Sequence, residues 1–370
     1  MTIANGTVSV LTAAMPESIG DLTFATKEWV DAARHVLNEE VDRYREELEG
    51  VSRHSFSQVA RNAPAHLHAG NTLAYTVIFE NGGAEIVAEE LPDDQCDMKM
   101  TGDHSLMSNM ARLVFQGKDP KVLEAARNRL FSLGRWEMYG NQPPETVLHS
   151  IWQAVNDAMA ERTMPRFVFM TPEWVSNARA ILTTRARSVK YRDGIKNIDF
   201  TFSEEFSHTP KYAFPDGSHG GFWVQCRQGK LTIGAGPLPE NSQPADMLTK
   251  AMYAPVIPVG RTVVANMTDV EKEEQSEYQQ VAFRFDKELN LRPAEQTQPS
   301  GRGPMPPDLG RVFLPLHDEL SKRTSGELPS DYDNTIPTKW GEPQMFDRHP
   351  EYDPSLLRYD EVDIYGNPLS

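Results

Sequence analysis

Residues 24–37 read FATKEWVDAARHVL, and residues 169–182 read FMTPEWVSNARAIL. Eight of the fourteen positions are identical, at a constant offset of 145 residues. That offset is far longer than the period of a solenoid or propeller repeat, so the match indicates duplication of a whole domain. The sequence therefore predicts two related domains in tandem.

The match extends beyond both stretches, with an offset that grows by single residues. Ser55 meets Thr201 at an offset of 146, and Asp97 meets Asp246 at an offset of 149. Insertions of single residues in loops produce such a drift. After Asp246 the copies part, because the second continues into a segment with two prolines and a hairpin predicted within residues 261–285.

The copies and the flanking chain together predict four segments. They are a leader at residues 1–22, a first domain at 23–163, a second, divergent domain at 164–291 and a C-terminal arm at 292–370. The arm holds 12 of the 27 prolines but keeps large apolar residues such as Trp340 and Leu357. We predict an extended, ordered arm that wraps a domain or a partner subunit, the latter giving a homodimer, with disorder as the alternative.

Local patterns predict an α+β fold for the first domain. A helix is predicted to begin after Thr26, whose hydroxyl can accept from free amides of the first turn. β-forming residues on both sides of residues 81–83 predict a hairpin, and the alternation of Cys96, Met98 and Met100 predicts a third strand with one buried face. The other predicted elements are a helix capped by Asp103 that ends at Gly117, a helix from Pro120 to Phe131, a strand from Leu133 to Tyr139 and an amphipathic helix from Glu145 to Met159.

Charge and cysteine content exclude several classes of function. The chain of 370 residues has a formal net charge of -16, which argues against binding to nucleic acid or to an anionic membrane surface. Cys96 and Cys226 are the two cysteines, too few for a disulfide framework. The first twenty residues contain no Lys or Arg, and no apolar run is long enough to span a bilayer. We therefore expect a cytoplasmic protein without a membrane-spanning segment.

The chain resembles the sterol carrier protein 2 family, particularly its short bacterial members. The resemblance rests on the Glu-Trp helix start at residues 24–29 and its second copy, on the Asp97-Met98-Lys99-Met100 strand, on Asp119-Pro120 and on the closing strand and helix. It spans most of residues 20–162 and, more weakly, 165 to about 250. It implies two tandem domains of this kind, each with a roughly five-stranded, mainly antiparallel sheet covered by helices, the second copy being divergent.

The same resemblance implies an apolar tunnel that binds sterols, fatty acyl chains or similar ligands. The residues that it implies on the ligand-facing surface are Tyr75, Met98, Met100, Met107, Met110, Phe115, Trp136, Met138 and Trp152. The residue types agree with this expectation, because the chain has 15 methionines and flexible thioethers can adapt to varied ligands. A methionine or aromatic stripe also simply fills a core, so each of these residues has that alternative.

Four histidines are the candidates for catalysis: His66, His68, His208 and His219. If the segment at His66-Leu67-His68 is extended, both imidazoles lie on one side, but a zinc site needs a third ligand that the sequence does not offer. The sequence lacks a nucleophile elbow, a phosphate-binding loop, a His-Glu-x-x-His motif and a complete dinucleotide fingerprint. We therefore predict neither a metal nor an organic cofactor.

Three functions remain open from the sequence. The first is binding of a hydrophobic small molecule, such as a lipid, a sterol or an isoprenoid. The second is a cofactor-independent enzyme, such as a hydratase, lyase, isomerase or hydrolase, that uses the same cavity for a hydrophobic substrate. The third is a structural role in which the two copies mimic a dimer and the arm acts as a clasp.

Overall fold

The computed structural model describes residues 10–11, 13–143, 145–207, 209, 213–214, 217–253, 257, 260–261, 263 and 307–325. The chain divides into two compact units, Met1–Arg166 and Phe167–Ser370. Each unit combines helices with a sheet, so the α+β class predicted from the sequence is confirmed at that level.

The long helix α2 (Lys27–Arg43) of the first unit begins where the sequence predicts it. Thr26 is its N-cap, and the Thr26 hydroxyl accepts a hydrogen bond from the Trp29 backbone amide at 3.3 Å. Glu28 lies in the first turn, where the partial positive charge of the helix end stabilises a carboxylate. A short helix, α3 (Arg45–Leu48), follows.

Five strands form the sheet of the first unit, in the order β3-β2-β1-β4-β5. They are β1 (His54–Arg61), β2 (Thr72–Glu80), β3 (Gly83–Val87), β4 (Met98–Asp103) and β5 (Trp136–Gly140). β1 pairs antiparallel with β2 and parallel with β4, while the β2–β3 and β4–β5 pairs are antiparallel. The sheet is therefore mixed and mainly antiparallel, with β5 at one edge.

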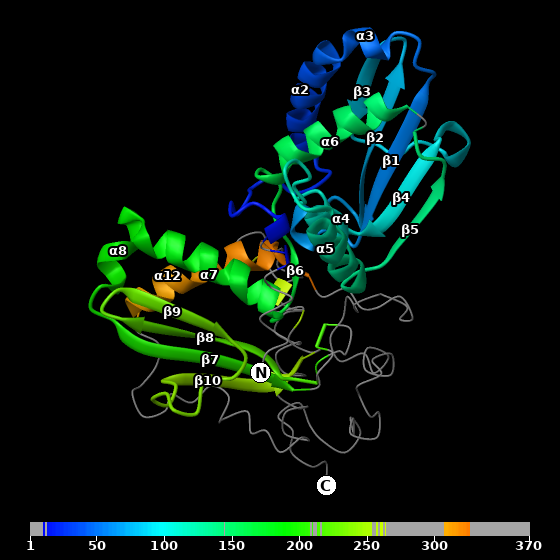
Figure 1. Ribbon diagram of the computed structural model, residues 1–370. Coiled ribbons are helices and arrows are strands. Elements are labelled where there is room, and N and C mark those ends of the chain that lie inside the picture. The colour runs from blue at the N-terminus through cyan, green and yellow to red at the C-terminus, as the bar shows by residue number, and fades with distance from the viewer. Residues whose placement is uncertain are drawn as a thin grey trace. The chain divides into compact units, whose positions relative to one another are not determined.

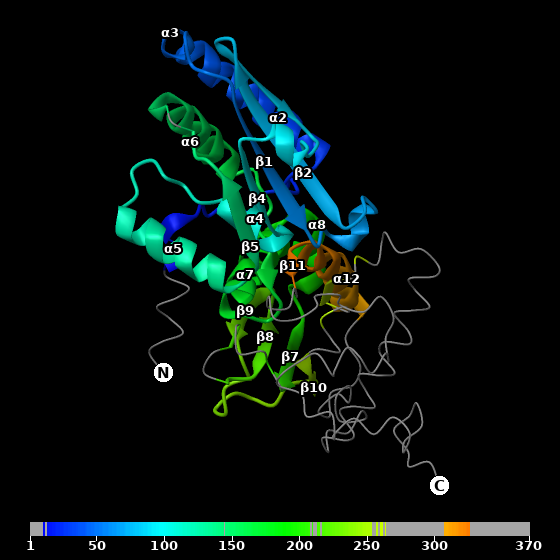
Figure 2. The same cartoon turned by 90° about the vertical axis from the view of Figure 1, so that its right-hand side faces the viewer.

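Two long helices cover one face of this sheet. α6 (Thr146–Ala160) packs against α2 and buries Leu148, Ile151, Val155 and Met159, which recur every three or four residues (Figure 1). This spacing places the four side chains on one stripe of the helix, as the sequence predicts. α4 (His104–Met110) and α5 (Pro120–Ser132) pack against each other and complete the helical side of the unit (Figure 2).

The predicted helix does begin after Asp103, which is the N-cap residue of α4, but it does not extend to Gly117. α4 ends at Met110, and the Asp103 side chain makes no cap hydrogen bond. The buried Asp103 carboxylate instead accepts from the Asn62 side-chain amide at 2.8 Å and from the Arg135 backbone amide and guanidinium at 2.7 and 2.8 Å. A buried carboxylate requires such hydrogen-bond partners.

The face of β4 opposite the helices is buried as well, although the sequence predicts only one buried face. Lys99 is 2% exposed there, and its ammonium donates to Glu90 at 2.7 Å, to the Leu91 carbonyl at 2.9 Å and to Asp93. Burial by itself lowers the pKa of Lys99, but the hydrogen bonds to Asp93 and Glu90 outweigh it and keep the pKa above its ordinary value. Lys99 is therefore a fixed cation on the far side of the sheet.

The second unit has a four-stranded sheet in the order β10-β7-β8-β9. Its strands are β7 (Asp199–Ser207), β8 (Gly220–Arg227), β9 (Lys230–Ala235) and β10 (Met247–Met252). β7 pairs antiparallel with β8 and parallel with β10, and β8 pairs antiparallel with β9. The four strands β1, β2, β3 and β4 of the first unit pair in the same way. The described residues of the second unit contain no counterpart of β5.

Helices accompany this second sheet (Figure 1). They are α7 (Pro172–Arg187), α8 (Val189–Ile195) and α12 (Pro307–Lys322), which contact one another. α12 lies in the segment for which the sequence predicts an extended arm. Leu316 and Leu320 are four residues apart on α12 and both are buried, which explains why this part of the arm is helical.

The same tryptophan contact occurs in both units. The Trp29 indole donates to the Thr163 hydroxyl at 2.8 Å, and that hydroxyl donates to the Met159 carbonyl near the end of α6. In the second unit the Trp174 indole donates to the Thr324 hydroxyl, also at 2.8 Å.

The surroundings of this contact also match. The Thr324 hydroxyl donates to the Leu320 carbonyl near the end of α12, and the short strand that follows, β11 (Thr324–Ser325), pairs with β6 (Phe167–Val168). An isolated bridge joins Leu22 to Thr163 in the first unit. α12 therefore stands in the second unit where α6 stands in the first.

Two further contacts recur at matching positions. The guanidinium of Arg34 donates to the Ile86 carbonyl at 2.8 Å, as that of Arg179 donates to the Ile233 carbonyl at 2.9 Å. The carboxylates of Asp97 and Asp246 each accept from the backbone amide near the start of the neighbouring strand, Ser55 or Thr201, at 2.7 Å.

Several predictions fall outside the described residues. The hairpin predicted within residues 261–285 does so apart from residues 261 and 263, and so does the arm apart from residues 307–325. The homodimer through the arm stays a prediction. No helix in the described part of the chain has the length and apolar character needed to cross a membrane.

Candidate functional site

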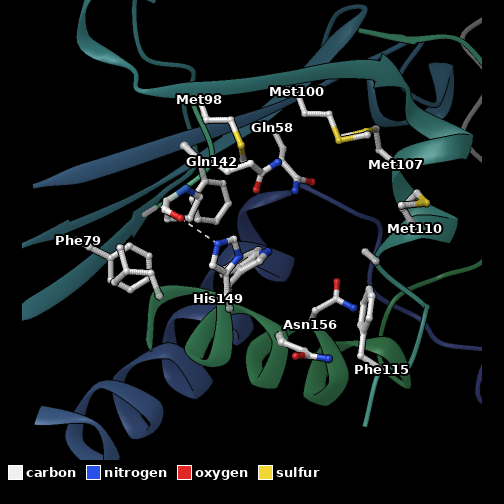
Figure 3. A pocket seen from close by; sticks show the side chains of 16 residues that line it. Gln58, Phe79, Met98, Met100, Met107, Met110, Phe115, Gln142, His149 and Asn156 are labelled. Carbon is white, nitrogen blue, oxygen red and sulfur yellow. Dashed lines mark hydrogen bonds between the residues drawn. The ribbon is translucent and has the colours of Figure 1, made fainter. Parts of the chain in front are cut away.

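A pocket of about 330 Å³ lies between the sheet and α6 of the first unit (Figure 3). β1 and β4 provide its sheet side, α4 and the following chain provide one end, and α6 closes it from the opposite side. Its lining consists of Phe56, Gln58, Phe79, Met98, Met100, Met107, Met110, Ala111, Phe115, Gln142, Pro143, Leu148, His149, Trp152, Gln153 and Asn156.

The two sides of the pocket differ in chemistry. Figure 3 shows four methionines, Met98, Met100, Met107 and Met110, along the side made by β4 and α4. α6 presents polar side chains from the opposite side, among them His149 and Asn156. The pocket therefore has a wall of adaptable thioethers facing a wall that can form hydrogen bonds.

The lining contains no Asp, Glu, Lys or Arg side chain. The polar members are Gln58, Gln142, His149, Gln153 and Asn156. The His149 Nε2 donates to the Pro143 carbonyl at 2.9 Å, and the Asn156 amide donates to the Leu113 carbonyl at 2.8 Å. These bonds leave the second imidazole nitrogen of His149 and the side-chain oxygen of Asn156 as acceptors.

One titratable group lies on the pocket face of β1 without lining the pocket. His54 precedes Phe56 by two residues, so both side chains point to the same face of the sheet. His54 is 5% exposed, and among the described residues its Nε2 has no hydrogen-bond partner. Burial lowers the pKa of His54, against the opposing effect of the Asp97 and Glu145 carboxylates. The imidazole is therefore neutral at pH 7.

Six of the nine residues that the sequence places on a ligand surface line this pocket. They are Met98, Met100, Met107, Met110, Phe115 and Trp152. Tyr75 lies instead in the core, with its ring 5.2 Å from Trp29 and 5.8 Å from Trp152, and burial raises its pKa well above the ordinary value. Trp136 and Met138 are on the edge strand β5, where they are 43% and 48% exposed.

Of the four predicted catalytic histidines, the three that the structure describes, His66, His68 and His219, do not line the pocket. The segment at His66 and His68 is not extended, because Ala65–Leu67 forms a 3-10 helix and His68 has a positive φ of 50°. His219 is half-exposed in the second unit and donates from Nδ1 to Glu205 at 2.7 Å. His208 lies outside the residues that the structure describes.

Several pocket residues were missed by the sequence reasoning, although a signal for them exists. The missed residues His149, Gln153 and Asn156 are four and three residues apart on α6, which is the spacing of one helix face. On β1 the two lining residues, Phe56 and Gln58, alternate with side chains of the other face. Their common exposure to a cavity depends on the β4 partners, which local patterns do not reveal.

A metal site is not formed by the described residues, since they contain no group of three or more His, Cys, Asp or Glu side chains placed to hold an ion. Cys96 and Cys226 are both free thiols, and burial raises the pKa of Cys226. The polar side chains of the pocket are amides and one imidazole, which are suited to hydrogen bonding rather than to holding a hard cation.

No protein-family model and no curated protein matches the chain. A solution structure of a conserved hypothetical protein from Thermus thermophilus, for which a sterol carrier role has been suggested, is similar at a TM-score of 0.26 and 18% sequence identity. The match covers 41% of this chain and 96% of that protein. A TM-score of this size does not establish a shared fold.

Proposed function

We propose that the first unit binds a hydrophobic small molecule, of the lipid, sterol or isoprenoid type, in the pocket between its sheet and α6. The observation that supports this is the pocket itself, of about 330 Å³, whose lining is mostly aliphatic, aromatic and thioether side chains with a few amides. Pockets of this size and composition are typical of small-molecule sites.

We further infer that the two units are tandem domains of the sterol carrier protein 2 type, with the second one divergent and followed by a proline-rich arm. The support is the shared strand pairing together with the matching tryptophan–threonine, arginine–carbonyl and aspartate–amide hydrogen bonds. The residues that make these framework contacts agree between the units, while the lining residue Gln58 is matched by Glu204.

A conversion of the ligand has no comparable support. None of His66, His68 and His219 lines the pocket, and the lining has no carboxylate or cysteine to act with His149. Binding without chemistry is therefore the function that the arrangement of side chains favours.

The test is native mass spectrometry of the purified protein, combined with titration of the uncharged dye Nile red. Met110 lines the pocket and is half-buried, so Met110→Trp should fill part of the cavity and weaken dye binding at least tenfold. Met138→Trp is the matched control, because Met138 is exposed and outside the lining. If the two variants bind the dye equally well, the pocket is not the binding site.

A further inference from the structure

Gln58 is a polar side chain on the sheet side of the pocket. It lies at the centre of the sheet, in register with Tyr75 of β2 and Met100 of β4. Its neighbours on the same face of β1 are Phe56 and Ala60, both buried. Gln58 is itself half-buried and lines the pocket (Figure 3).

The amide of Gln58 has no hydrogen-bond partner among the side chains and backbone groups of the described residues. A partly buried amide without a partner is a group that a ligand can satisfy, because its oxygen accepts and its nitrogen donates. In apolar pockets a small number of such groups fixes the orientation of the ligand.

The surroundings do not suit a charged ligand group at this place. The lining contains no Lys or Arg, and the Lys99 ammonium next to Met100 is held by Glu90 and Asp93 on the opposite face of the sheet. His54, on the pocket face of β1, is held neutral by its burial. A carboxylate moved from water to the side of Gln58 would lose hydration without gaining a counter-ion.

We propose that Gln58 determines the specificity of this pocket and that the ligand carries an uncharged hydrogen-bonding group, a hydroxyl, carbonyl or amide, that pairs with the Gln58 amide. This inference rests on the proposed function, since it names the class of ligand for the same pocket. The proposal predicts that the pocket prefers uncharged amphiphiles over fatty acids and over pure hydrocarbons, although all three classes have the same apolar chain.

The experiment compares three probes of equal chain length on the full chain at pH 8: 1-dodecanol, dodecane and dodecanoate. Each probe competes with Nile red. The inhibition constant of dodecanol against the dye is expected to be at least threefold lower than that of dodecane, and at least tenfold lower than that of dodecanoate. Equal displacement by all three, or a preference for dodecanoate, overturns the inference but leaves the proposed function standing. If the dye binds but no probe displaces it, or if the dye does not bind, the proposed function fails.

Substitution of Gln58 then separates its role from general packing. Gln58→Leu is nearly equal in size and is expected to lower the preference for dodecanol over dodecane to less than twofold while dye binding persists. Gln116→Leu is the matched control, since Gln116 is exposed and does not line the pocket, and it should keep the wild-type preference. An unchanged preference in Gln58→Leu contradicts the assignment, and retained dye binding shows that the variant is folded.

Discussion

The most informative difference between the two units is one residue on a matching strand, which is β1 in the first unit and β7 in the second. In the first unit, β1 carries Gln58 between Phe56 and Ala60 on the helix-covered face. The aligned strand β7 carries Glu204 between Phe202 and Phe206. A neutral amide and an ionisable carboxyl thus occupy matching places in two sheets with the same strand pairing, so the same framework accommodates different chemistry on this face.

Aromatic rings surround Glu204. In the second unit the Phe202 and Phe222 rings lie 5.7 Å apart, and Phe169 lies 5.8 Å from Phe206. Phe222 is also the cross-strand partner of Glu204. Burial raises the pKa of the Glu204 carboxyl to about 7. The second unit therefore holds an ionisable carboxyl among aromatic rings at the position where the first unit holds an amide.

The largest expected effect comes from removing α12. Deletion of residues 307–370 takes away Thr324, the partner of the Trp174 indole, and uncovers the side of α7 and α8 that α12 contacts. We expect α7 and β8 to lose their protection from hydrogen exchange while α2 and β1 keep theirs. Deletion of residues 326–370 is the control, since it leaves α12 and β11 in place. Equal protection in both deletions would mean that α12 is not the counterpart of α6.

A smaller effect is expected from Glu204→Gln, which gives the second unit the residue type of the first. The folded state keeps the Glu204 proton up to about pH 7, whereas an unfolded chain releases it near the ordinary value of 4.5. The stability of the wild type should therefore fall as pH rises from about 4.5 to 7, by up to about 3 kcal/mol.

Above pH 7 the penalty for ionising Glu204 is complete, so the variant should be more stable than the wild type at pH 8 and nearly equal to it at pH 4.5. Hydrogen exchange of β7 and β8 at the two pH values measures this. Glu240→Gln is the control, because Glu240 is exposed in a loop. A wild type whose β7 protection does not change across the window would show that the Glu204 carboxyl is hydrated.

The smallest effect, and one that should be equal in the two units, follows from the tryptophan contacts. Thr163→Val and Thr324→Val each leave a buried indole N–H without its acceptor, at a cost of about 1 to 2 kcal/mol. Urea unfolding followed by hydrogen exchange assigns the loss to one unit. We expect the two variants to lose similar amounts of stability, each in its own unit. A loss of stability in one unit alone would show that the two tryptophan contacts are not equivalent.

Local signals sufficed to predict the helix starts and the hairpin of the first unit. Thr26 accepts from the Trp29 amide at the predicted helix start, and the turn residue Asn81 has a positive φ value where the hairpin was predicted. These features depend on residues close in sequence, so propensity and capping rules capture them.

Features that depend on distant residues were missed. β1 was not predicted as a strand, because residues 54–58 are polar apart from Phe56, and the burial of Ser57 depends on a distant partner, Thr76. The role of Asp103 depends on Arg135, and the helix α12 is stabilised by α7 and α8 more than 110 residues earlier. The sequence predicted the methionines of the pocket but not Gln58 and His149. A polar residue can be recognised as pocket lining only when its spatial neighbours are known.

The account depends above all on the first unit holding a hydrophobic molecule between its sheet and α6. Native mass spectrometry of the wild type beside Met110→Trp and Met138→Trp, before and after addition of 1-dodecanol, is the most direct measurement. We predict a bound molecule on the wild type and on Met138→Trp, and little or none on Met110→Trp. The absence of any bound molecule from all three proteins, or equal occupancy in all three, would contradict the account.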